Sequence, residues 1–173
     1  RKVKVGLFLL EALLHELDSI ACNANFRGGL GRLGRCILHG LKQSENIDFR
    51  CCVPLYARPW KDPESEPISY EKYGPIVHIE KLFVDNKEVA VTARALFGGE
   101  QILGIECPEV LDILYNDIRH QRWLQEVVYS RGAVAALQAG GFIPEVAWIN
   151  DTHPALAAAQ LQASVNPYVK VLY

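Results

Sequence analysis

The stretch "VKVGLFLL", residues 3–10, decides the fold class of this chain. It is an almost unbroken apolar run. A strand with one face in solvent alternates apolar and polar residues, whereas an unbroken run is typical of a strand buried on both faces. Such strands occur in mainly parallel sheets that carry helices on both sides. The run therefore predicts a central strand of an α/β domain.

The rest of the chain alternates between strand-like and helix-like patterns. Apolar residues recur at helical spacing from Leu30 to Leu41, Leu33 among them, and residues 49–56, "FRCCVPLY", predict a second strand. The further elements expected are a hairpin of strands 76–84 and 88–95, strands near 101–105, 146–149 and 169–173, and helices over 108–139 and 154–163. The predicted fold class is an open, mainly parallel α/β sheet with helices on both faces. This Rossmann-like fold carries a β-hairpin excursion and forms a single domain over residues 1–173.

Composition excludes several classes of function. Half of the 173 residues are apolar and the net charge is −2, so the chain can bury a full core and offers no basic patch for nucleic acid or for a membrane surface. Five cysteines without metal-ligand spacing indicate reduced thiols, no metal site and a cytoplasmic protein. The chain has no methionine and ends on an expected strand, so we expect it to be a fragment whose next loop follows Tyr173.

The glycine-rich stretch "RGGLGRLGR", residues 27–35, spells the dinucleotide pattern G-x-G-x-x-G. A dinucleotide site needs its first glycine directly after the first strand and an acidic residue at the end of the second. Here the glycines come far after Leu10, and the second strand ends without an acid. Two interpretations stay open. The glycine backbone before the helix binds phosphate or a sugar, or the loop only needs positive φ.

A second polar stretch, "WINDTHP", follows the strand expected at 146–149. Asp151 and His153 are two residues apart and lie where α/β sheets place ligand groups. The alternative is structural, with Asp151 capping the helix that Pro154 begins. Glu11 is a weaker candidate, since it ends the first strand on the same edge.

Two of these segments resemble the α-glucan phosphorylase family, which includes glycogen and maltodextrin phosphorylases. "GGLGRLG" (28–34) resembles its glycine loop, and "NDTHPALA" (150–157) matches its downstream motif closely. "LFLLE" (7–11) faintly resembles the first strand of the family. "RWLQEVVYSRGAVAAL" (122–137) resembles the helix that carries its R-x-x-Q-E pattern.

The resemblance implies the N-terminal domain of a two-domain GT-B glycosyltransferase. This family transfers a glucosyl unit from an α-1,4-glucan to inorganic phosphate, giving glucose 1-phosphate, with pyridoxal 5′-phosphate as cofactor. The cofactor lysine belongs to the family's second, C-terminal domain, which this chain lacks. We therefore expect the domain alone to bind no cofactor and to be inactive.

The resemblance also implies the site residues and the partners. The substrate- and phosphate-binding residues expected are Gly28, Gly29, Leu30, Gly31, Asp151, His153 and Glu11. No residue of this domain is assigned a catalytic role. The expected partners are the α-1,4-glucan, phosphate and the C-terminal domain, and a homodimer is left open.

Three rival functions remain. The first is the N-terminal domain of a glycogen or starch synthase, which uses a nucleotide sugar. Those enzymes usually carry a lysine just before the glycine pair, where this chain has Arg27. The second is a non-catalytic sugar-binding module, and the third is a dinucleotide-binding protein.

Overall fold

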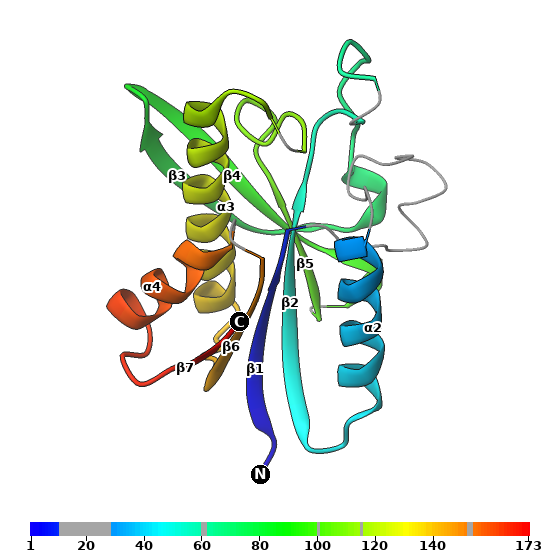
Figure 1. Cartoon of the computed structure of the whole chain (residues 1–173), viewed down its shortest axis with the longest axis vertical. Helices are drawn as coiled ribbons and strands as arrows, with labels where there is room; N and C mark the ends of the chain where they lie inside the picture. Colours follow the sequence, from blue (N-terminus) through cyan, green and yellow to red (C-terminus); the bar gives the residue numbers. More distant parts are fainter. Residues whose placement is uncertain (11–28, 60–61, 100, 115, 152–153) are drawn as a thin grey trace.

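The computed structural model describes residues 1–10, 29–59, 62–99, 101–114, 116–151 and 154–173, with the backbone alone for residues 29 and 30. These residues form one seven-stranded sheet in the order β3-β4-β5-β2-β1-β6-β7, with helices on both faces (Figure 1). The strands are β1 (Val3–Leu9), β2 (Ile47–Leu55), β3 (Ile76–Val84), β4 (Lys87–Ala95), β5 (Ile102–Glu106), β6 (Val146–Asn150) and β7 (Lys170–Leu172). The helices are α2 (Gly29–Gln43), α3 (Arg119–Ala139) and α4 (Ala155–Ser164), with short 3-10 turns at Glu71–Tyr73 and Leu96–Gly98.

Strand β1 lies near the middle of the sheet, parallel to β2 on one side and to β6 on the other. Leu7 and Leu9 belong to the core on the α2 face, whereas Phe8 and Leu10 belong to the core beneath α3 and α4. All four side chains are at most 2% exposed. The unbroken apolar run is thus explained by burial on both faces, and the predicted fold class is confirmed.

Helix α2 covers one face of the sheet, and its buried positions include glycines as well as leucines. Its buried positions are Gly31, Gly34, Leu38 and Leu41. Leu33, which the apolar spacing placed on the buried face, is 47% exposed. Gly31 was expected in the loop before the helix, but it lies within the first turn. Because glycine has no side chain, the burial of Gly31 and Gly34 adds nothing to an apolar pattern, and the spacing placed the exposed Leu33 on the buried face.

The expected hairpin is formed by β3 and β4, which are antiparallel. Its two-residue turn, Asp85–Asn86, has φ values of 49° and 61°, the left-handed conformation that such hairpins require. Strand β4 continues the sheet antiparallel to β5, while β5, β2, β1, β6 and β7 are parallel.

Helix α3 begins later than its apolar pattern predicts. The pattern starts at Pro108, but the helix begins at Arg119, and the described residues 107–114 and 116–118 before it form a loop. Leu111 and Leu114 in this loop are each 1% exposed, so they are core residues although they are not helical. The helix ends at Ala139, the residue predicted from the sequence, with Gly140 as its C-cap and Gly141 next at φ 66°. In the part of the chain that the structure describes, no helix combines the length and apolar character needed to span a bilayer.

Candidate functional site

The carboxyl ends of β1 and β6 meet at one edge of the sheet, where Leu9 is paired with Asn150. Ligands of open α/β sheets bind outside this edge, in the loops that follow the strands. Asn150 is the last residue of β6 and Asp151 follows it directly. The structure therefore places Asp151 at the edge that the sequence analysis predicted.

Two features of Asn150 and Asp151 go beyond a simple helix cap. Asp151 has φ 83°, and a residue other than glycine in this region carries backbone strain, which often marks a functional position. Asn150 is 8% exposed, and its buried amide nitrogen Nδ2 has no hydrogen-bond partner in the described part of the chain. A buried amide without a partner costs free energy that a ligand oxygen could recover. The sequence analysis missed Asn150 as a site residue.

Helix α2 starts at the same edge, because it runs back against the direction of the parallel strands (Figure 1). Gly29 opens the helix and Gly31 is in its first turn. The first-turn N–H groups have no carbonyl partner within the helix itself. Leu30 is described by its backbone alone. Glu11, Gly28 and His153 lie outside the described residues.

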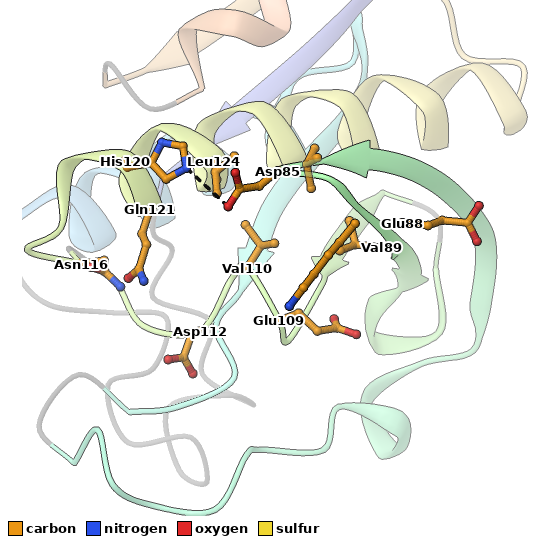
Figure 2. Close-up of a pocket in the computed structure, with 12 residues that line it drawn as sticks. Asp85, Glu88, Val89, Glu109, Val110, Asp112, Asn116, His120, Gln121 and Leu124 are labelled. Atoms are coloured by element: carbon orange, nitrogen blue, oxygen red, sulfur yellow. Dashed lines mark ion pairs between the residues drawn. The ribbon is translucent and has the colours of Figure 1, made fainter.

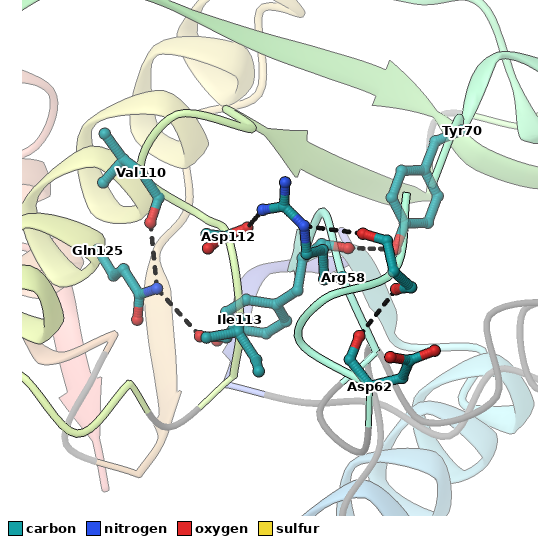
Figure 3. Close-up of polar contacts among 9 residues, drawn as sticks. Arg58, Asp62, Tyr70, Val110, Asp112, Ile113 and Gln125 are labelled. Atoms are coloured by element: carbon teal, nitrogen blue, oxygen red, sulfur yellow. Dashed lines mark hydrogen bonds and ion pairs between the residues drawn. The ribbon is translucent and has the colours of Figure 1, made fainter. Parts of the chain in front are cut away.

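The loops after β2 and β5 are fastened to each other at this edge of the sheet (Figure 3). Arg58 forms an ion pair with Asp112, and its Nε donates to the carbonyl oxygen of Ser65 at 2.9 Å. The backbone N–H groups of Ala57 and Arg58 donate to the carbonyl oxygens of Leu111 and Asp112, each at 2.8 Å. The two loops thus form a fixed wall beside the carboxyl ends of the strands.

Gln125 of α3 secures the same wall from the other side. Its Nε2 donates to the carbonyl oxygens of Val110 and Ile113, both at 3.1 Å, as Figure 3 shows. Gln125 is 3% exposed. The R-x-x-Q-E pattern of this helix therefore contributes its glutamine to positioning the loop after β5.

A separate pocket of about 500 Å³ lies beyond the carboxyl end of β5 (Figure 2). The hairpin turn, the loop after β5 and the first turn of α3 line it. Its polar lining residues are Asp85, Lys87, Glu88, Glu109, Asp112, Asn116, His120 and Gln121. Its carboxylates can accept hydrogen bonds from hydroxyl or ammonium groups.

His120 has two partners at the rim of this pocket. Its Nε2 is 3.6 Å from Oδ2 of Asp85, and its ring stacks on Trp123 with centroids 6.3 Å apart. No local pattern in the sequence pointed to this pocket, because its walls come from three separate segments.

The cysteines of the described chain offer no reactive group at either place. Burial raises the pKa of Cys51 and Cys52, and burial together with the nearby Glu109 carboxylate raises the pKa of Cys107 to about 12. These thiols stay protonated at neutral pH and are unreactive. Among the described residues there is no group of His, Cys, Asp and Glu that could hold a metal ion.

Comparison with known proteins identifies a solved structure with a similar fold. No protein-family model matches the sequence, and no curated protein does. The structure is similar to the catalytic domain of starch synthase IV from Arabidopsis thaliana, solved with bound ADP and acarbose. The TM-score is 0.59 at 15% sequence identity, and the match covers 98% of this chain but 32% of that one. The chain therefore has the fold of one domain of a GT-B glycosyltransferase and spans about a third of the protein it resembles.

Proposed function

We propose that this chain is the N-terminal domain of a GT-B glycosyltransferase, and within that class of an α-glucan phosphorylase. The observation that carries the proposal is the pair Asn150–Asp151 at the carboxyl end of β6. There, a buried amide without a partner adjoins a carboxylate on a left-handed backbone. The fold similarity supports the glycosyltransferase class. The "NDTHPALA" stretch around this pair, and Arg27 in place of a lysine, favour a phosphorylase over a synthase.

The chemistry of this edge suits an uncharged sugar beside an anion. A carboxylate such as that of Asp151 accepts hydrogen bonds from sugar hydroxyls, and the amide of Asn150 donates one. The first-turn N–H groups of α2, at residues 29–31, are neutral donors that favour phosphate oxygens. His153 and Glu11 remain proposed partners of the same sugar. We propose that the domain uses these groups to position a glucosyl unit next to phosphate.

The cofactor proposed for such an enzyme, pyridoxal 5′-phosphate, does not fit the described residues. It needs a lysine at the active site for its imine. Apart from Lys4, which is half-buried near the amino end of β1, the lysines that the structure describes are exposed. We therefore propose that a second domain holds the cofactor, and that this chain alone has no turnover.

A starch or glycogen synthase is the second candidate, and the structural neighbour with bound ADP favours it. Both candidates predict a sugar at the edge beside Asp151. They differ in the second ligand, which is inorganic phosphate or glucose 1-phosphate for a phosphorylase and a nucleotide sugar for a synthase.

Ligand titration of the chain tests the proposal. With Trp60→Phe and Trp123→Phe in place, Trp148 is the remaining tryptophan, and it lies two residues before Asn150. We expect maltoheptaose and glucose 1-phosphate to change its fluorescence weakly, and Asp151→Asn to weaken both responses about tenfold, the loss of one charged hydrogen bond.

Asp117→Asn, an exposed carboxylate before α3, is the matched control and should leave the titration unchanged. A response to ADP-glucose stronger than to glucose 1-phosphate would favour the synthase. Tight binding of NAD, or sugar binding that ignores Asp151→Asn, would contradict the proposed site.

A further inference from the structure

Strand β3 forms an open edge of the sheet. It is paired with β4 on one side, and no described strand lies on its other side. Every second residue of such a strand directs its backbone N–H and C=O away from the sheet, where another strand can bind. Natural edges are commonly protected by proline, by lysine or by inward-pointing charges. No proline occurs within Ile76–Val84, and a bulge between Ile76 and His78 affects only its first residues. The two charges at the centre of the strand are each paired within the chain, Lys81 with Glu88 at 2.9 Å and Glu80 with His78 at 3.5 Å.

The regular part of β3, residues 78–84, exposes large apolar side chains. Phe83 is 75% exposed and Ile79 is 54% exposed. Trp123 of α3, which is 54% exposed, borders the same hollow of about 210 Å³ as Phe83, together with Val127 and Arg131. Exposed aromatic side chains beside an open strand edge are typical of a protein interface.

We propose that this edge binds the β3 edge of a second copy of the chain, antiparallel, so that the two sheets become one continuous sheet. The assembly is independent of the proposed function. A two-fold axis at Lys81 pairs the segment 78–84 with itself, so each interface contact occurs twice. Ile79 then lies opposite Phe83 of the second copy, a β-branched and aromatic pair of the kind that stabilises antiparallel strands.

Charge complementarity favours this register over its neighbours. Glu80 of the second copy comes to lie opposite Leu82, and Leu82 lines the same hollow as Arg131. Arg131 is exposed, and no carboxylate of the described residues is paired with it. An ion pair between Arg131 and Glu80 of the second copy follows from this placement.

The two Lys81 residues meet at the axis, but each is already paired with Glu88 of its own chain, Nζ to Oε1 at 2.9 Å. Their repulsion is therefore reduced. An axis at Glu80 would instead bring two Glu80 carboxylates together on the half-buried face beside α3, where they would repel more strongly.

Sedimentation velocity across the micromolar range tests the dimer. We expect the chain to dimerise, and Ile79→Lys, which places a charge opposite Phe83 of the second copy, to raise the dimer Kd at least about tenfold. Leu172→Lys is the matched control: it lies on the opposite edge strand, β7, and is 50% exposed. A monomeric wild type, or a dimer that Ile79→Lys leaves intact, would overturn the proposal.

Charge reversal tests the register and does not depend on how Ile79→Lys folds. Glu80→Arg and Arg131→Glu should each weaken the dimer, and the double variant should restore most of the affinity. In a Cys36→Ser background, Lys81→Cys should give a covalent dimer on mild oxidation, since residues at the axis of an antiparallel pair are within disulfide range. Failure of both restoration and cross-linking would refute the Lys81-centred interface.

Discussion

Gly132 lies inside α3 at the point where the helix contacts the sheet most closely. A Cβ at this position would come 2.4 Å from Cγ1 of Val91 and 3.0 Å from Cγ2 of Ile105. We expect Gly132→Ala to lower the free energy of unfolding by about 1–3 kcal/mol, because the helix must move away from the sheet. Urea denaturation measures the loss.

Gly40 in α2 provides the opposite case, and it serves as the control. No atom lies within 4 Å of a Cβ built there, and the residue is exposed. Gly40→Ala should raise the free energy of unfolding by about 0.5–1 kcal/mol through helix propensity alone. Equal effects of the two substitutions would show that the contact at Gly132 does not limit helix packing.

The environment of a single residue could be predicted where the neighbouring sequence determines it. The apolar spacing correctly identified Leu38 and Leu41 as buried. It missed Gly31 and Gly34, because a buried glycine adds nothing to an apolar pattern. Asp151 was predicted from its place after a strand, but the missing partner of Asn150 is visible only in three dimensions.

Among the elements, the loop after β5 depends on a single glutamine. Gln125 donates to two carbonyl oxygens of that loop, as described above. Gln125→Leu should lower the free energy of unfolding by about 1–3 kcal/mol, because two half-buried carbonyls lose their donor. Urea denaturation measures this cost, and native-state hydrogen exchange over residues 107–118 should become faster.

Gln121→Leu, on an exposed position of the same helix, is the control and should change stability by less than about 0.5 kcal/mol. If loop exchange in the two variants is the same, Gln125 does not hold the loop.

Elements with regular periods were predictable, and the irregular one was not. The hairpin of strands 76–84 and 88–95 was predicted correctly, and its turn residues Asp85 and Asn86 are of types that tolerate positive φ. The start of α3 was placed too early, because Leu111 and Leu114 keep helical spacing while Gln125 stabilises a non-helical backbone around them. The hydrogen bonds from Gln125 to this loop cannot be inferred from the apolar periodicity of the loop itself.

For the molecule as a whole, the buried thiols and Tyr129 make the free energy of unfolding sensitive to pH in the alkaline range. Burial raises the pKa values of Cys51, Cys52, Cys107 and Tyr129. Between about pH 9 and pH 12 the unfolded chain releases these protons while the native chain keeps them. The free energy of unfolding therefore falls with rising pH, by about 1.4 kcal/mol per pH unit for each thiol.

Urea denaturation at pH 7.5, 9.5 and 10.5 measures this slope. Cys107→Ala removes one of the thiols, whose pKa is about 12 in the native chain, and should make the slope shallower by about 1.4 kcal/mol per pH unit. Cys36→Ser, at an exposed position of α2, is the control and should leave the slope unchanged. An identical slope for Cys107→Ala and the wild type would contradict the prediction.

At the scale of the whole chain, the sheet class was predictable and the pocket was not. The unbroken run at residues 3–10 was sufficient to predict a parallel sheet covered on both faces. The pocket of Figure 2 is built from the turn at Asp85, the loop at Glu109 and the helix start at His120. These three segments come together only because β4 pairs antiparallel with β5. The sequence of each segment alone does not show which strand pairs with which.

The central position of β1 has a consequence for synthesis on the ribosome. Strand β1 must wait for β6, since Leu9 pairs with Asn150 and the two residues are 141 positions apart in the sequence. Strands β1 to β5 can assemble earlier, which leaves one flank of the nascent β1 without its neighbour until β6 has been synthesised. Contacts of such long sequence separation slow folding and expose partly folded chains to aggregation. Slow codons placed after β5, or a chaperone that shields this flank, should therefore raise the yield of native protein.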